Sequence, residues 1–240
     1  MSTSAAAEKE TAPKPVAAHA HGDGHHDDHG GDPHEAWPPD PHFGKASMGK
    51  IGMWFFLCSD ALSFGGLLLG YGILRGQSTE WIHPGEPELG INFTAGLTFL
   101  LICSSVTMVL AFAAMMEKNK KGTLTFLGLT ILGGALFLCG QAQEYFGTFS
   151  FIFGHHGLVH EGLIFGASHY ATTFYCITTF HGAHVTAGVV ILSITWINIA
   201  RGKYDHDWNY NHLEIVGLFW HFVDLVWILV FTLVYLVPQP

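Results

Sequence analysis

Charged residues are scarce in this chain, which contains 240 residues and has a formal net charge of −9. Asp, Glu, Lys and Arg together make up 12% of it, whereas about 25% is usual in a soluble domain. Hydrophobic residues make up 49%. The scarcity of charge indicates a membrane protein, and the acidic balance gives no support to nucleic-acid binding.

Cysteine is also rare, and its spacing matches no common metal or haem motif. The four residues are Cys58, Cys103, Cys139 and Cys176. None lies in a C-x-x-C or C-x-x-C-H spacing, so the sequence has no haem attachment site, zinc knuckle or iron–sulfur pattern. Each cysteine falls in a different apolar stretch, and we expect each to be buried as a small apolar side chain.

The first 47 residues lack an apolar run followed by a small-residue cleavage site, so they do not resemble a signal peptide. They hold eight of the 19 acidic residues and seven of the 17 histidines, in a low-complexity arm rich in His, Asp and Pro. Such a composition cannot bury a core, and we expect the arm to be mobile or to lie on a partner. The cluster His25, His26 and His29 could bind copper or zinc; the alternative is a solvated arm without metal.

The remainder, residues 48–240, contains five apolar stretches that are long enough to cross a hydrocarbon core about 30 Å thick. They cover approximately residues 51–74, 93–116, 124–143, 170–200 and 213–237. Each run is continuous rather than alternating, which is typical of membrane helices and not of barrel strands. We therefore expect an all-α bundle of five transmembrane helices.

Lysine and arginine lie mainly on one side of these expected helices. Four precede the first helix, three lie between the second and third, and two lie between the fourth and fifth. Only Arg75 falls on the other side. Because cytoplasmic loops carry an excess of basic residues, we expect a cytoplasmic N-terminus and a C-terminus outside.

Two carboxyl groups belong to the first and third expected helices. Asp60 falls near the middle of the first, where a carboxylate must be protonated, hydrogen-bonded or paired. It is either a structural group bonded to a neighbouring helix, or a site that exchanges protons or holds a lipid head group. Glu144 directly follows the apolar stretch 124–143 at the end of the third helix, where it could sit at the membrane interface.

The last two stretches carry ionisable side chains at helical spacing. His181 and His184 are three residues apart and so share one face, as do Glu214, His221 and Asp224. The two histidines could hold a metal, but such a site needs three or four ligands. We favour a polar network in which the histidine face of the fourth helix meets the Glu/His/Asp face of the fifth.

Two phrases of the sequence resemble subunit III of haem–copper terminal oxidases. Residues 180–188 resemble the family's F-H-G-x-H-V-x-x-G, and residues 214–227 resemble its E-x-x-x-x-x-W-H-F-V-D-x-V-W. Residues 53–60 and 144–146 add weaker support, and the resemblance covers about residues 48–237. The chain is similar to a short bacterial form that lacks the first two of the seven helices found in the longest members.

The resemblance implies a subunit of the bacterial inner membrane without redox centres of its own. Haems and copper would belong to subunits I and II, in an enzyme that pumps protons and reduces oxygen, within a possible larger respiratory supercomplex. The chain would bind phospholipids, stabilise subunit I and support proton uptake. The implied polar interior comprises Asp60, Glu144, His181, His184, Glu214, His221 and Asp224. The implied lipid contacts are Asp60, Trp54, His221 and Trp227.

The electron donor remains open between cytochrome c and quinol. An aspartate at position 60 also occurs in quinol oxidases of the superfamily, whereas Glu214 matches the cytochrome c branch better. We favour cytochrome c. Alternative functions are an accessory subunit of a nitric oxide reductase and, of another class, an independent proton-coupled transporter. Transporters usually show internal repeats and broken helices, and the sequence shows neither.

Overall fold

A computed structural model of the chain describes residues 48–78, 81, 90–147, 157–160, 162–203 and 211–237. This part contains five long α-helices: α1 (Met48–Gln77), α2 (Ile91–Met116), α3 (Lys120–Phe146), α5 (His169–Ala200) and α6 (Asn211–Val230). A π-helical segment, η1 (Phe231–Leu236), continues α6. Five helices are long and apolar enough to cross a membrane, with α6 and η1 counted as one. The predicted all-α bundle of five transmembrane helices is confirmed, while residues 1–47 lie outside the described residues.

The helices extend up to four residues beyond the predicted apolar stretches, because hydropathy detects only the part that lies in hydrocarbon. The third helix illustrates how its ends are set. Its N-cap residue, Asn119, accepts a hydrogen bond from the Gly122 backbone N–H at 3.1 Å. Gly147 ends the helix in a left-handed conformation, with φ of 62°, which glycine adopts without strain. Both signals are local and lie outside the apolar run.

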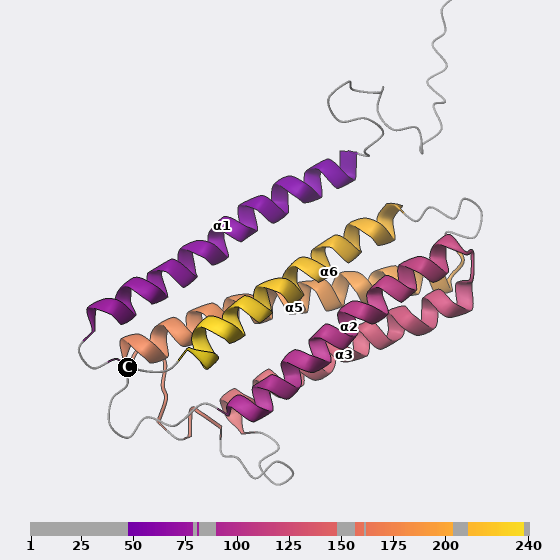
Figure 1. The fold of residues 1–240 in the computed structure, drawn as a ribbon. Helices are drawn as coiled ribbons and strands as arrows, with labels where there is room; N and C mark the ends of the chain where they lie inside the picture. The colour runs from indigo at the N-terminus through magenta and orange to yellow at the C-terminus, as the bar shows by residue number, and fades with distance from the viewer. Residues whose placement is uncertain are drawn as a thin grey trace, which may run out of the picture. The chain divides into compact units, whose positions relative to one another are not determined.

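Helix α6 lies at the centre of the bundle and is the most buried of the five spans. It contacts α1, α2 and α5, while α2 and α3 form the most extensive helix pair. Figure 1 shows α1 along one side of α6 and the α2–α3 pair along the other. The start of α1 and the end of η1 lie at opposite ends of this part, as an odd number of crossings requires.

Most basic residues gather at one end of the helices. This end contains the start of α1, the turn between α2 and α3, and the end of α5 (Figure 1). The basic residues there are Lys50, Lys118, Lys120, Lys121, Arg201 and Lys203. Arg75, in the last turn of α1, lies at the opposite end. The described residues therefore carry the charge asymmetry that the positive-inside rule uses.

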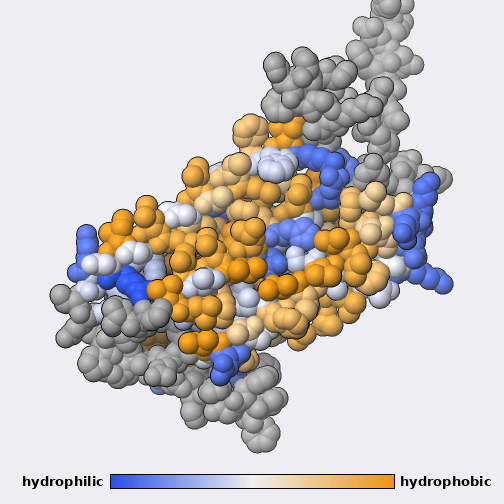
Figure 2. Space-filling model, in the orientation of Figure 1, coloured by the Kyte–Doolittle hydropathy of each residue, from blue (hydrophilic) through white to orange (hydrophobic). Residues whose placement is uncertain are grey.

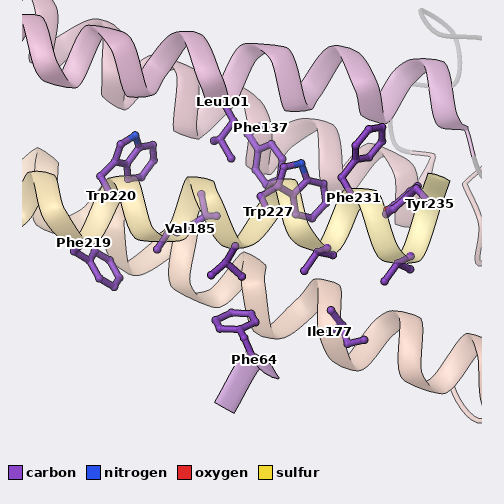
Figure 3. Packing of buried hydrophobic residues seen from close by; sticks show 14 of the residues in the cluster. Phe64, Leu101, Phe137, Ile177, Val185, Phe219, Trp220, Trp227, Phe231 and Tyr235 are labelled. Carbon is purple, nitrogen blue, oxygen red and sulfur yellow. The ribbon is translucent and has the colours of Figure 1, made fainter. Parts of the chain in front are cut away.

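Trp220 of α6 packs tightly against α3 and α5. A Cβ atom added to Gly134 of α3 would lie 2.5 Å from this indole ring, and one added to Gly188 of α5 would lie 2.9 Å from it. Figure 3 shows Trp220 and Trp227 projecting from the same side of α6. Both indoles are about 1% exposed. Because close packing replaces the hydrophobic effect between helices in a bilayer, the two glycines allow this indole to be enclosed.

The outer surface of the described helices is mostly hydrophobic, as expected for side chains that face lipid (Figure 2). All four cysteines belong to this surface. The prediction that they are buried was therefore wrong. In a membrane protein an apolar stretch has two apolar surroundings, the bundle interior and the lipid, so hydrophobicity alone does not tell which one a small side chain faces.

Candidate functional site

Asp60 of α1 and His184 of α5 join their two helices near the middle of the bundle. The His184 Nε2 atom lies 3.1 Å from Asp60 Oδ1, and both side chains are largely buried. The other ring nitrogen, Nδ1, lies 2.8 Å from the carbonyl oxygen of Phe180. Phe64 packs against the imidazole with ring centroids 5.2 Å apart. Asp60 therefore has the arrangement expected of the structural alternative, a carboxyl bonded to a neighbouring helix.

The two tryptophans of α6 hydrogen-bond to hydroxyl groups of α2. Trp227 Nε1 donates to the Thr98 hydroxyl at 3.0 Å. Trp220 Nε1 donates to the Ser104 hydroxyl at 3.2 Å. All four side chains are buried. A buried indole N–H without an acceptor would be costly, so these two bonds fix the rotation of α6 against α2.

His221 and Asp224 of α6 meet the same helix at a third point. His221 Nδ1 lies 2.6 Å from the Ser105 hydroxyl oxygen. The Asp224 carboxyl lies beside that hydroxyl as well. Asp224 is 6% exposed, and its Oδ1 atom has no hydrogen-bond partner in the described part of the chain. The Ser105 hydroxyl thus lies next to two ionisable side chains and is bonded to His221.

Glu144 is half-buried two residues before the end of α3, where its carboxyl contacts neighbouring helices. Thr94 of α2 donates to its Oε1 atom at 3.1 Å. Tyr235 of η1 donates to its Oε2 atom at 3.2 Å. The carboxyl of α3 is thereby bonded to α2 and to the π-helical end of the last span. It connects three segments at the end of the bundle opposite to the basic residues.

His181 is fully buried and surrounded by aromatic rings. Its ring centroid lies 4.8 Å from that of Trp227 and 5.8 Å from that of Phe137. Neither of its nitrogens has a hydrogen-bond partner among the residues that the structure describes. Its contacts with α3 and α6 are therefore packing contacts.

Glu214 lies in the first turn of α6, where its carboxylate pairs with Lys50 of α1 at 2.7 Å. The two side chains are 28% and 31% exposed, Lys50 first, so the pair belongs to the basic end of the bundle rather than its interior. The carboxylate is only three residues from the start of the helix. Its position in the sequence, seven residues before His221, does not bring it into the interior.

The structure does not contain the predicted network between the histidine face of α5 and the Glu/His/Asp face of α6. His184 pairs with α1 instead, and His221 pairs with α2. Helical spacing identifies which residues share a face, but it does not identify the helix that this face meets. The polar groups therefore form separate small contacts, each between different helices.

The sequence interpretation missed the hydroxyl residues of α2 and the tyrosine of η1. Thr94, Thr98 and Ser105 follow each other at four and seven residues, so they lie along one face of α2. Such spacing is a signal that could have identified α2 as the polar partner of α6. Tyr235 carried no comparable signal, because its contact with Glu144 forms at a π-helical segment.

No group of three or more His, Cys, Asp and Glu side chains among the described residues is arranged to hold a metal ion. The tract His25, His26 and His29 lies outside these residues. Within them, the ionisable side chains have neighbours that are hydroxyls, a backbone carbonyl, aromatic rings or an opposite charge.

The membrane part of the chain matches a known family along its length. The family model of cytochrome c oxidase subunit III matches residues 43–238. This match covers all five spans and every polar contact described above. The chain belongs to the cytochrome c oxidase subunit III family.

Relatives within this family come from several bacteria. A cytochrome c oxidase subunit 3 from Synechocystis is 34% identical over 196 residues, which are 81% of this chain and 78% of the relative. A cytochrome bo(3) ubiquinol oxidase subunit 3 from Pseudomonas putida is 32% identical over 192 residues, 80% of this chain and 87% of the relative. The chain is therefore similar to subunits of oxidases that differ in their named donor.

The family's histidine-containing phrase belongs to α5 and its tryptophan-rich phrase to α6. In three dimensions these phrases provide the contacts of His184 with Asp60, of Trp220 with Ser104, and of Trp227 with Thr98. The residues that carry the resemblance are thus largely residues that join helices.

An open groove of about 400 Å³ lies between α1, α5 and α6. Its lining is almost wholly apolar and includes Met53 and Phe56 of α1, Ala187 and Ile191 of α5, and Phe219 of α6. His184 also borders it.

The four residues predicted to contact lipid differ in exposure. Trp54 is 61% exposed on the outer side of α1, and His221 is half-buried. Asp60 is 7% exposed and faces His184. Trp227 is 1% exposed and bonded to Thr98, so the prediction that it contacts lipid was wrong.

Proposed function

We propose that this subunit III belongs to a proton-pumping oxidase that transfers electrons from cytochrome c to oxygen, and that it carries no redox centre itself. Haems and copper would be held by subunits I and II. The observation that carries the proposal is that residues of the two family phrases form contacts between helices. His184, Trp220 and Trp227 all have structural partners within this chain.

The contribution of the chain would be a rigid helical wall beside subunit I. The hydrogen bonds between α2 and α6 and the Asp60–His184 contact hold the spans in one register. Such contacts are costly to disrupt in a low-dielectric interior, because the remaining partner stays buried and unpaired. A fixed wall would support subunit I during turnover and help to sustain proton uptake.

Phospholipid binding would use the groove between α1, α5 and α6. Its volume of about 400 Å³ and its apolar lining suit an acyl chain rather than a polar solute. The groove is open to the surface that faces the bilayer, so a lipid could enter without separating the helices. The subunit would lie in the bacterial inner membrane, with its basic end in the cytoplasm.

A quinol oxidase is the second candidate for the complex. The relative from Pseudomonas putida, named as a ubiquinol oxidase subunit, supports it, with 32% identity over 80% of this chain. Cytochrome c oxidase subunits from other bacteria reach similar identity. Purification of the complex with this chain, followed by haem spectra and oxidation assays with cytochrome c and with quinol, separates the two. Absence of haem from a complex that retains the chain would contradict both.

Replacement of Asp224 by alanine tests the structural role. The variant should lower the amount of this chain that co-purifies with the oxidase, because it removes a carboxyl that lies beside Ser105 at the α2–α6 contact. The haem spectrum of the remaining complex should stay unchanged. Leu62→Ala is a matched control, since Leu62 is 78% exposed on α1. Loss of haem, or normal retention and turnover, would contradict the proposal.

A further inference from the structure

The surface formed by α2 and α6 differs from an ordinary lipid-facing surface because an ionisable side chain, His221, reaches it near the middle of the span. His221 lies ten residues after the start of the last span and fifteen before its end. At a rise of about 1.5 Å per residue, it is roughly 15 Å from the nearer end of the helix. This depth corresponds to the hydrocarbon interior rather than to the headgroups.

His221 belongs to the outward face of α6. Leu225 and Ile228 share this face at helical spacing, and they are 64% and 40% exposed. The histidine itself is half-buried, as is Ser105 beside it on α2. The polar group therefore reaches the outside of the bundle.

The hydrogen-bonding capacity of this site is not filled within the described residues. Ser105 occupies only the Nδ1 atom of His221, and no described residue pairs with its Nε2 atom. Asp224, three residues after His221 on α6, has a buried Oδ1 atom without a partner among the described residues. An exposed hydroxyl elsewhere in the last span is bonded to a backbone carbonyl of that span. Thr232, an exposed residue of η1 in the same span, donates to the Ile228 carbonyl oxygen at 2.7 Å.

Hydrocarbon does not supply hydrogen bonds, and an ionisable side chain at this depth normally faces a protein interior or a polar cavity. A lipid head group cannot provide the partner, because head groups lie at the ends of the span. A neighbouring membrane helix with a hydrogen-bonding group at the same depth can provide it. Family membership implies such neighbours in the form of other oxidase subunits.

We propose that the α2–α6 surface around Ser105, His221 and Leu225 is the docking face of this chain for a transmembrane helix of another oxidase subunit. That helix presents a hydrogen-bonding group to His221. The proposal rests on the function given above and specifies which surface makes the contact. Ser105 orients the imidazole, and the exposed side chains of Leu225 and Ile228 add apolar area next to the polar contact.

A photo-crosslinking amino acid at position 225 tests the proposal in the complete oxidase, in its native membrane. Leu225 is on the proposed face, and we expect a covalent adduct with another oxidase subunit. The control position is Leu132, which is 54% exposed on α3, a helix that contributes no residue to the proposed face. It should give no adduct with the same subunit.

Three outcomes of this experiment would overturn the docking face. They are an adduct between two copies of this chain, an adduct with the partner subunit from position 132 but not 225, and only lipid adducts from position 225 in an intact complex. If the chain does not co-purify with haem at all, the proposed function fails together with the docking face. The two failures are therefore distinguishable.

Substitution of the histidine provides a second measurement. His221→Leu should reduce co-purification of the chain about 3- to 15-fold, the range that single hydrogen bonds between membrane helices provide. His221→Gln, which can still hydrogen-bond, should restore most of it. Thr232→Val should have no effect, because that hydroxyl is bonded to its own helix. The abundance of the chain in the membrane, measured in parallel, should stay constant; equal retention of the Leu and Gln variants would contradict the proposal.

Discussion

At the scale of single residues, the ionisable side chains of the described spans differ in the groups that surround them. His184 shares its two nitrogens between Asp60 and a carbonyl oxygen, whereas His181 relies on aromatic packing alone. Two histidines that are three residues apart in one motif therefore have different surroundings. The reason is that one points between α5 and α1, while the other points into the centre of the bundle.

Removal of one partner from the Asp60–His184 contact should destabilise the subunit more than removal of both. His184→Leu leaves a buried carboxyl without its partner, which costs about 3–5 kcal/mol in comparable cases. The double variant Asp60→Leu with His184→Leu should recover part of that loss. Denaturant titration of the purified complex, followed through release of this chain, measures both. Equal losses in the single and double variants would show that the contact is energetically unimportant.

At the scale of helices, α6 determines the arrangement of the bundle because it contacts α1, α2 and α5. Its indoles point toward α2 hydroxyls, and small residues on α3 and α5 enclose Trp220. Its π-helical continuation presents Tyr235 to Glu144. The last span thus combines close packing with hydrogen bonds at several depths, which is how helices associate where lipid is as apolar as the side chains.

Because Gly134 lies against Trp220, replacement of this glycine by alanine should destabilise the subunit, whereas the same replacement at Gly65 should not. Gly134→Ala would place a Cβ atom 2.5 Å from the indole, and overpacking of this kind costs about 1–3 kcal/mol. Gly65→Ala on α1 meets nothing within 4 Å and serves as the control. The temperature at which the subunit dissociates from the purified complex should fall for the first variant only. An unchanged temperature for Gly134→Ala would mean that α3 can move away from the indole without loss.

At the scale of the whole membrane part, the two ends of the helices differ in their number of basic residues. Six basic residues of the described part lie at one end, with the Lys50–Glu214 pair among them, while Arg75 lies at the other. Because all five spans connect these ends, the orientation of one helix determines that of the others. The charge asymmetry predicts that the basic end faces the cytoplasm.

Accessibility of introduced cysteines tests this orientation in intact cells. His160→Cys, in an exposed turn near the end of α3, should react with a membrane-impermeant maleimide. Lys118→Cys, in the turn between α2 and α3, should react only after the cells are opened. The four native cysteines lie within the spans, so the unmodified chain provides the background. The reverse pattern would place the basic end outside.

The sequence by itself determined the number of spans, their approximate bounds and the family. Continuous apolar runs identify membrane helices strongly, because a segment in hydrocarbon must be apolar and must satisfy its backbone hydrogen bonds internally, as a helix does. Two phrases of unusual composition identified subunit III, and the match over residues 43–238 confirms it. The sequence also marked the ionisable residues of the spans, since charge at that depth needs a partner. His184 and Glu144 do have partners on other helices, whereas His181 has none among the described residues and Glu214 lies at the basic end.

Only the tertiary structure decided which partners those residues have. Periodicity assigns residues to a face of a helix, but the helix opposite that face depends on how all five pack. His221 therefore met Ser105 of α2 instead of the histidines of α5, and Glu214 met Lys50 at the basic end. The outward position of the cysteines had the same cause, because lipid and protein interior are both apolar and sequence hydrophobicity does not separate them.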